Sequence, residues 1–443
     1  MSKGKISMVS LGCAKNRVDA EMLLYKLKQA GYEITDDPAF CDAAIVNTCG
    51  FIESAKQESI DEIIELGRLK DEGKIKAIVV TGCLAERYKE QVAKQLPEAD
   101  AVIGIGANAD IVSVVDKALN NEKYTSFPDK LSLPLNGERL QSTPFYTAYL
   151  KVAEGCDNRC AYCAIPLIRG GFRSRKLEDI VKEAKTLMQN GVIELNVIAQ
   201  DTTRYGEDLY GKYMLPTLLK ELCKIDGVRW IRVLYCYPDR ITDELLDVMA
   251  QEDKIVKYMD IPLQHCNKKV LRDMNRRGDK ESLTKLLNKV RQKVPGVVLR
   301  TTLIAGFPDE SEEEFEELCQ FVKEVRFDRL GCFAYSQEED TPAAEMQNQI
   351  DEDVKEKRAE IIMNEQRPIA EDYCKNAIGK TLDVLVEGYD RYGECFFGRS
   401  FADAPEVDPV VFFTTNGKRV SAGEMVSVKI TDYLDLDLVG ELA

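Results

Sequence analysis

The sequence of 443 residues has a single histidine, His265, and fewer basic than acidic residues. Its 60 lysines and arginines stand against 76 aspartates and glutamates, which gives a formal net charge of −16 at pH 7. Proteins that hold nucleic acid by its phosphates usually carry the opposite charge, at least locally. The shortage of positive charge therefore disfavours a nucleic acid as the macromolecular partner and favours a basic protein.

The sequence also lacks any apolar run long enough for a membrane-spanning helix, and no secretory signal opens it. We therefore expect a cytoplasmic protein with no membrane partner. Thiols stay reduced in that compartment. The 14 cysteines are then expected to bind metal or to remain free thiols, and not to form disulfides.

Three of these cysteines recur at the same place in three successive strand–helix units. Apolar runs predict the strands at residues 6–10, 44–47 and 77–80. Cys13, Cys49 and Cys83 each follow one of them. Alternating strands and helices form parallel sheets, in which ligands gather at the carboxyl ends of the strands. We expect the three thiols at one sheet edge, as ligands of a four-iron cluster with one open iron, or of a zinc ion; three buried core thiols are the alternative.

A second group of cysteines lies on one short loop. Three residues separate Cys156 from Cys160 and two separate Cys160 from Cys163, with Tyr162 before the last thiol. Three thiolates at this spacing can hold three irons of a cubane and leave the fourth iron free to chelate S-adenosylmethionine. A structural zinc loop would need a fourth ligand nearby, and the only histidine lies far along the chain.

These motifs resemble those of a known family. The loop with Tyr162 before its last cysteine resembles the radical S-adenosylmethionine superfamily, and its pairing with the upstream thiols is similar to the methylthiotransferase family within it. Four segments resemble the RimO branch of that family, which modifies an aspartate of a ribosomal protein. They are Leu11–Asn16, Asn47–Ile52, Ala164–Gly170 and Ile261–His265. Ala14 departs from the branch, where proline is expected, and leaves the ligands untouched.

The resemblance implies two four-iron, four-sulfur clusters and S-adenosylmethionine as cofactors, with the six cysteines as ligands and no further catalytic residue. It implies that one S-adenosylmethionine methylates a sulfur held at the upstream cluster. A second yields a radical that takes hydrogen from the β-carbon of the aspartate. A basic small-subunit ribosomal protein, an electron donor and a sulfur source are the implied partners. A tRNA adenosine methylthiotransferase is one alternative, and an RNA-binding protein with structural metal sites is another.

We expect an α/β protein with three domains. Residues 1–135 are expected to form a parallel-sheet βα domain with the auxiliary cluster, and residues 136–147 a linker. The resemblance implies a partial (βα)6 radical S-adenosylmethionine barrel over residues 148–376. Residues 377–443 are expected to form a small antiparallel β-barrel that resembles the TRAM domain.

Residues at the strand ends of the middle domain would face S-adenosylmethionine. The candidates are Tyr162, Gln200, Asp201, Arg232 and Gly306. Gly306 would let the backbone approach the ligand closely, whereas a strand-face ion pair is the alternative role of Arg232. We expect His265 to be a hydrogen-bonded structural residue. The eight other cysteines, Cys236 among them, share no metal spacing and are expected to be ordinary thiols.

The last domain is acidic. It contains 6 basic and 12 acidic residues, a poor surface for phosphates. We predict that acidic residues in its loops attract the basic ribosomal protein, so that tRNA is disfavoured. These residues are Glu387, Asp390, Glu394, Asp403, Glu406 and Asp408. A solvated acidic surface without a partner is the alternative.

Overall fold

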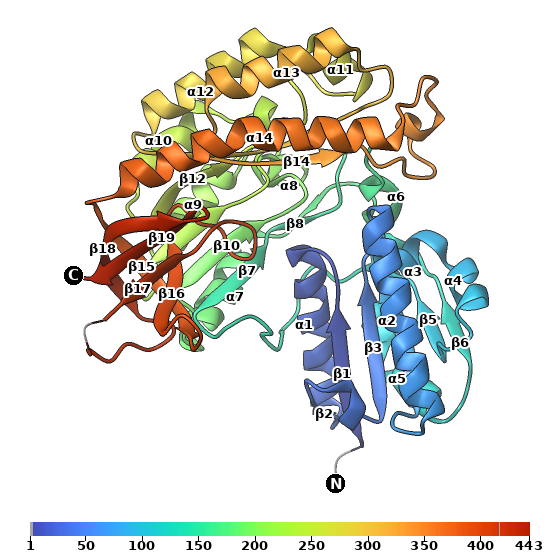
Figure 1. The fold of residues 1–443 in the computed structure, drawn as a ribbon. Coiled ribbons are helices and arrows are strands. Elements are labelled where there is room, and N and C mark those ends of the chain that lie inside the picture. The colour runs from blue at the N-terminus through green and yellow to red at the C-terminus, as the bar shows by residue number, and fades with distance from the viewer. Residues whose placement is uncertain (1–2, 416) are drawn as a thin grey trace.

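The computed structural model describes residues 3–415 and 417–443, which form three domains in chain order (Figure 1). The N-terminal domain, in blue, lies beside the middle domain, in cyan to orange. The small C-terminal barrel, in red, packs against the middle domain. Within these two described ranges, no helix is long and apolar enough to cross a membrane.

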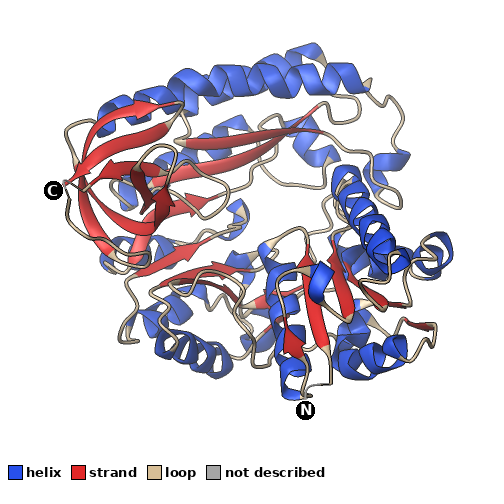
Figure 2. Ribbon diagram, turned by 60° about the horizontal axis from the view of Figure 1, so that its bottom comes forward, coloured by secondary structure: helices blue, strands red, loops and turns tan. Residues whose placement is uncertain are grey.

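The N-terminal domain is a parallel sheet with helices on both faces (Figure 2). Its strand order is β2–β1–β3–β4–β5–β6. The strands are β1 (Lys5–Ser10), β2 (Glu33–Ile34), β3 (Ala43–Thr48), β4 (Ala77–Gly82), β5 (Ala101–Ile103) and β6 (Tyr124–Ser126). The three predicted strands are confirmed as β1, β3 and β4, and three shorter strands extend the sheet on either side.

Helix packing explains why the central strands are apolar throughout. Helices α1 (Ala14–Gln29) and α5 (Ile111–Leu119) bury one face of the sheet. Helices α2 (Glu53–Asp71), α3 (Cys83–Tyr88) and α4 (Glu90–Gln95) bury the other. Because both faces are covered, every residue of β3 and β4 is buried, as is usual for parallel strands between helices.

The middle domain is a curved sheet of six parallel strands, which confirms the predicted partial barrel. Its strand order is β14–β13–β12–β11–β10–β7. The strands are β7 (Thr147–Lys151), β10 (Glu194–Ile198), β11 (Trp230–Val233), β12 (Ile255–Asp260), β13 (Val298–Ala305) and β14 (Arg329–Ala334). The helices are α6 (Ile165–Arg169), α7 (Leu177–Gln189), α8 (Glu207–Tyr210), α9 (Leu215–Cys223), α10 (Asp243–Gln251), α11 (Lys268–Asp273), α12 (Lys280–Lys293), α13 (Glu312–Val325) and α14 (Glu352–Ala377).

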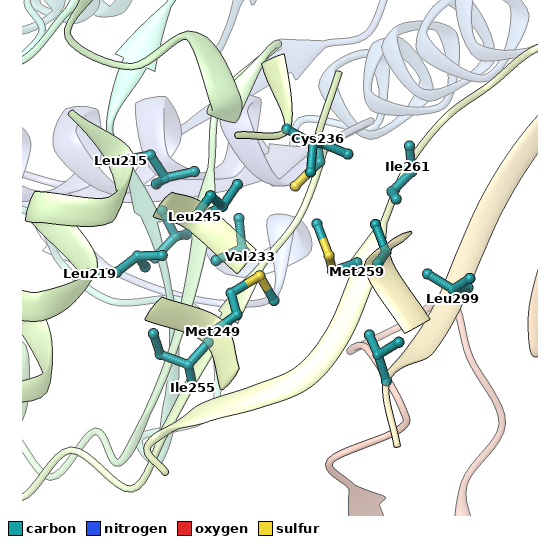
Figure 3. Close-up of a cluster of buried hydrophobic side chains, with 14 of the residues drawn as sticks. Leu215, Leu219, Val233, Cys236, Leu245, Met249, Ile255, Met259, Ile261 and Leu299 are labelled. Carbon is teal, nitrogen blue, oxygen red and sulfur yellow. The ribbon is translucent and has the colours of Figure 1, made fainter. Parts of the chain in front are cut away.

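The core of the middle domain lies between the sheet and its helices. Figure 3 shows Val233, Met259 and Leu299, from three neighbouring strands, gathered with Leu245 and Met249 of α10. A short hairpin of β8 (Ala153–Glu154) and β9 (Arg173–Ser174) stands apart from the sheet and carries the cysteine loop between its strands. Packing of this core thus fixes the positions of the strand ends, and the β8–β9 hairpin fixes the position of the cysteine loop.

The C-terminal domain is a closed barrel of five strands in the order β15–β16–β17–β19–β18. The strands are β15 (Thr381–Asp390), β16 (Cys395–Ser400), β17 (Val411–Thr414), β18 (Met425–Leu434) and β19 (Asp437–Leu442). The predicted small antiparallel barrel is confirmed, with one exception: β17 and β19 run parallel. Strand directions cannot alternate all the way around a closed ring of five, so one parallel pair is unavoidable.

Candidate active site between two domains

All six predicted cysteine ligands line one cavity of about 340 Å3 between the N-terminal and middle domains. Cys13 and Cys49 come from the turns that follow β1 and β3, and Cys83 is the first residue of α3, directly after β4. The other three thiols come from the loop between β8 and α6. The parallel-sheet rule therefore led to the correct sheet edge, and the fold places the second group of thiols opposite it.

Close contact holds the turns that carry Cys13 and Cys49 together. A Cβ atom at Gly12 would lie 2.8 Å from Sγ of Cys49, so only glycine fits there. The amide of Asn16 donates hydrogen bonds to the carbonyl oxygens of Leu11 at 2.9 Å and of Asn47 at 3.2 Å. The first turn is thus fastened to the end of β3, which brings Cys13 next to Cys49.

The cysteine loop is held by Arg276, a residue that the motif search did not single out. Its guanidinium donates to the carbonyl oxygen of Pro262 at 2.7 Å and to the hydroxyl of Tyr162 at 3.4 Å. It also donates to Sγ of Cys160 at 3.7 Å and stacks on the ring of Tyr237 at 4.3 Å. Arg276 therefore places positive charge beside the thiols of the loop.

Arg169 does the same for the upstream thiols, although it comes from α6 of the middle domain. Its guanidinium donates to Sγ of Cys83 at 3.3 Å and to Oδ1 of Asn16 at 2.9 Å. It also pairs with Asp19 and, at 3.3 Å, with Glu154. Both carboxylates pair with Lys151 as well. Two buried cations and two buried anions thus join the domains beside the cavity.

Burial and charge shift the pKa values of these groups in opposite directions. Burial raises the pKa of Cys83 to about 12 and that of Cys156 to about 11. Burial acts on Cys13 as well, but the charges of Lys15 and Arg169 outweigh it, so the pKa of Cys13 lies below its ordinary value. Thiols must lose their protons to bind metal, so cluster assembly at these sites releases protons.

The residues present fit two iron–sulfur clusters. Each group offers three sulfur ligands, and in each an arginine donates a hydrogen bond to one of the sulfurs. Such hydrogen bonds balance the negative charge of a thiolate-bound cluster. Between residues 3 and 443, residue 416 aside, no three His, Cys, Asp or Glu side chains are arranged to hold a single metal ion.

Comparisons with known proteins agree with this geometry. Residues 5–104 match uncharacterized protein family UPF0004, residues 150–322 the radical SAM superfamily and residues 378–443 the TRAM domain. The chain is 50% identical to the ribosomal protein uS12 methylthiotransferase RimO of Desulforamulus reducens, over 99% of each chain. It is 48% identical to the RimO protein of Clostridioides difficile, over 99% of this chain and 98% of that one. The chain belongs to the RimO methylthiotransferase family.

A solved structure supports the fold. The radical S-adenosylmethionine methyltransferase TsrM from Kitasatospora setae, with cobalamin and a four-iron cluster bound, superposes with a TM-score of 0.55. The match covers 77% of each chain at 14% identity. About three quarters of this RimO-family chain therefore shares its fold with that structure.

The predicted contacts to S-adenosylmethionine divide into two groups. Tyr162 and Gln200 line the cavity. The amide nitrogen of Gln200 donates to Glu154 at 2.8 Å, while its buried amide oxygen has no hydrogen-bond partner among the described residues. Asp201 is buried nearby, where it accepts hydrogen bonds from Asn158 and Arg240, both at 2.9 Å.

The structure contradicts the other two assignments. Arg232 is buried against the C-terminal domain, where it donates to the carbonyl oxygen of Phe401 at 2.7 Å and pairs with Glu194 at 3.4 Å. The alternative of a strand-face ion pair is thus the correct one. A Cβ at Gly306 would meet Cγ of Lys355 at 2.5 Å, so this glycine permits close packing of α14 and not of a ligand.

His265 has the structural role expected of it. Its side chain is fully buried. Nδ1 accepts a hydrogen bond from the backbone nitrogen of Asn267 at 2.9 Å, and Nε2 lies 3.5 Å from the carboxylate of Glu310. These contacts fix the segment that follows β12.

Several lining residues were missed. They are Lys15, Tyr235, Cys236, Tyr237, Gln264 and Arg276. Tyr235, Cys236 and Tyr237 come directly after β11, so the rule that ligands gather at strand ends could have found them. No sequence signal marked Arg276, which lies outside the strands and acts on the loop from beyond α11.

Two of the six predicted acidic residues of the C-terminal domain face inward, so the prediction of a six-residue docking surface is wrong for these two. Asp403 pairs with Arg329 at 2.8 Å, and Asp408 accepts a hydrogen bond from Tyr258 at 2.5 Å. Their side chains are only 3% and 4% exposed. The physical reason is that the loop between β16 and β17 packs against the open barrel, where its carboxylates neutralise buried arginines.

Two further acidic residues are engaged by arginines elsewhere, one within the barrel and one across the contact with the N-terminal domain. Glu387 accepts a hydrogen bond from Arg399 at 2.8 Å, and Glu406 pairs with Arg17 of the N-terminal domain at 2.6 Å. Asp390 and Glu394 lie at the turn between β15 and β16. The predicted surface is therefore reduced to this turn.

Proposed function

We propose that this protein transfers a methylthio group to the β-carbon of an aspartate in small-subunit ribosomal protein uS12. The observation that carries the proposal is that six thiols from two domains line one cavity. The full-length similarity to proteins named ribosomal protein uS12 methylthiotransferase supports the substrate. A structural metal protein would have no need of an enclosed space shared by two ligand sets.

The chemistry explains the cofactors. A side-chain base cannot deprotonate an unactivated carbon. When bound, the clusters and S-adenosylmethionine would supply a radical that removes the hydrogen atom, and they would also supply the sulfur that takes its place. Cys156, Cys160 and Cys163 would hold the cluster that binds S-adenosylmethionine. The three upstream thiols, Cys13, Cys49 and Cys83, would hold the auxiliary cluster.

The remaining residues bind and orient. The free amide oxygen of Gln200 can accept a hydrogen bond from S-adenosylmethionine. Tyr162 lines the same cavity, and Asp201 holds Asn158, another lining residue, by a hydrogen bond. Arg169 and the carboxylates around it keep the two domains in register and exclude water from the space between the thiols. Exclusion of water and oxygen protects a radical reaction from side products.

The reaction consumes electrons and sulfur, so we infer an electron donor and a sulfur source as further partners. Because uS12 is a ribosomal protein, we place the reaction in the cytoplasm. The turn with Asp390 and Glu394 is our candidate for the first contact with this basic substrate, since opposite charges speed encounter.

Mass spectrometry of ribosomal proteins and tRNA from cells with and without the gene tests the proposal. We expect uS12 from the deletion strain to lack the methylthio group and tRNA to be unchanged. Loss of methylthio groups from tRNA adenosines instead would make the tRNA-modifying alternative correct.

A further inference from the structure

Lys15 is a buried cation in the wall of the cavity. Its side chain lines the space between the two groups of thiols, two residues after Cys13. The residue is only 7% exposed. Across the described ranges of the chain, no ion pair joins its ammonium group to a carboxylate. Buried lysines are rare unless they are paired, because removing an ammonium group from water is costly.

The position of Lys15 in the fold increases the free-energy cost of burying its ammonium group. Lys15 is in the first turn of α1, and this turn contains no acidic residue. The start of a helix carries partial positive charge, so a lysine there is opposed by the helix dipole. A residue that breaks such a local rule without an evident structural gain is expected at a functional site.

The other cations of the cavity are engaged. Arg169 is neutralised by Asp19 and Glu154. Arg276 donates hydrogen bonds to a carbonyl oxygen, a hydroxyl and a thiol. Glu154 could approach Lys15, but Lys151, Arg169 and Gln200 already occupy its oxygens. The ammonium of Lys15 is therefore the charge in this wall that the protein leaves for a ligand.

Tyr235 of the middle domain fixes the position of this ammonium. Nζ of Lys15 lies 3.4 Å from the centre of the Tyr235 ring. Tyr235 has a φ of +61°, which is costly for a tyrosine. Asp260 accepts its backbone N–H at 2.9 Å and Thr202 donates to its carbonyl at 3.0 Å, so the strained backbone is held from both sides. A cation on an aromatic face is attracted by the ring but keeps its full charge.

We propose that Lys15 binds the carboxylate of the substrate aspartate and so selects a carboxylate side chain over a nucleobase. This inference rests on the proposed function. In aspartate the reacting β-carbon is bonded directly to the carboxylate carbon, so anchoring the carboxylate fixes the β-carbon to within one bond. Because Lys15 shares a turn with Cys13, this anchor holds the β-carbon beside the upstream thiols and facing the loop thiols.

The test compares two substrates in the cluster-loaded enzyme: uS12 and its variant with asparagine in place of the target aspartate. Lys15→Met keeps the length of the side chain and removes the charge. We expect the wild type to favour the aspartate substrate, and Lys15→Met to lower kcat/KM for that substrate at least about thirtyfold. The variant should hardly affect the asparagine substrate, and Lys15→Arg should restore part of the preference.

Three measurements separate this role from a structural one. Iron content and cleavage of S-adenosylmethionine to 5′-deoxyadenosine in the absence of uS12 should be unchanged in Lys15→Met. Arg17→Met is the matched control, because Arg17 lies in the same helical turn but pairs with Glu406 outside the cavity. It should leave the preference for aspartate unchanged.

Equal losses with both substrates would overturn the inference and make Lys15 a structural residue. A raised KM for S-adenosylmethionine in the uncoupled reaction would also overturn it, because the carboxylate bound by Lys15 would then be that of the cofactor. If the wild type transfers nothing to uS12, the proposed function fails and this inference fails with it.

Discussion

Arg169, on a helix of the middle domain, donates a hydrogen bond across 3.3 Å to the thiol of Cys83 in the N-terminal domain. One side chain thus connects the helix that follows the cysteine loop, our proposed site of one cluster, to a proposed ligand of the other. Positive charge beside a cluster stabilises an added electron, so we expect this contact to tune the reduction potential of a cluster held by the upstream thiols.

We expect Arg169→Gln to lower the reduction potential of the upstream cluster by roughly 60 mV, a tenfold change in a one-electron equilibrium. The loop cluster should change little. A redox titration followed by electron paramagnetic resonance gives both values. Arg272→Gln is the control, because Arg272 has a side chain that is 73% exposed. Identical upstream potentials in the wild type and Arg169→Gln would show that the hydrogen bond has no electronic role.

Iron content distinguishes the two ligand sets. The anaerobically reconstituted protein should hold about eight irons, and replacement of Cys13, Cys49 and Cys83 by alanine should leave about four. That variant should still cleave S-adenosylmethionine but transfer no methylthio group, because the loop cluster alone generates the radical. Cys236→Ala should keep about eight irons, although Cys236 lines the same cavity. Full iron content in the triple variant would exclude an upstream cluster.

Acid should weaken the contact between the middle and C-terminal domains. Burial would raise the pKa of Glu194, but Arg399 and Arg232 outweigh it and lower the pKa to about 2. The unfolded chain takes up this proton more readily, so the stabilisation is complete above pH about 4.5 and is lost as pH falls toward 2. It amounts to about 3 kcal/mol.

Urea unfolding of the metal-free protein at several pH values measures this effect. Glu194→Gln should be less stable than the wild type at neutral pH, because two buried arginines lose their charged partner. Its stability should also fall less steeply between pH 4.5 and 2. If the free energy of unfolding depended on pH in the same way in both proteins, protonation of Glu194 would not be the cause of the loss of stability in acid.

Charge reversal tests the turn between β15 and β16. Asp390→Lys with Glu394→Lys should weaken binding of uS12 and flatten its salt dependence, since exposed charges act through screened attraction. Asp432→Lys with Asp435→Lys is matched in net charge and lies at the end of β18. It should have a smaller effect. Equal effects would assign the attraction to overall charge, and tight, salt-sensitive binding of tRNA by the wild type would identify a different partner.

The repeated strand–helix pattern was enough to predict where the thiols lie. Cys13, Cys49 and Cys83 could be placed at one edge because strand direction in a parallel sheet fixes where each strand ends. Arg232 and Gly306 could not be assigned in the same way. The sequence shows where these residues lie relative to the strands. It does not show which part of the protein packs over them, because that depends on how the C-terminal domain and α14 are placed.

The sequence also could not predict which charged residues are buried. Asp403 and Asp408 look like surface acids in an acidic segment, yet each is buried beside a residue from a strand of the middle domain that is remote in sequence. Lys15 shows the converse. Its burial could not be foreseen from α1 alone, because Tyr235 approaches it from another domain.

The loop between β16 and β17 makes the C-terminal barrel a wall of the middle domain. Arg232 donates hydrogen bonds to backbone carbonyl groups at the start of that loop, and Glu194 pairs with Arg399. A chain that ended before residue 378 would lose these contacts and expose the two charged side chains, which are buried in the full chain. The small domain that carries our candidate contact for the ribosomal protein is therefore also packed into the middle domain through buried charges. Replacing the small C-terminal domain with one from another protein is therefore not enough to alter the substrate range. The replacement must also bring the same carboxylates and carbonyl groups to the same arginines.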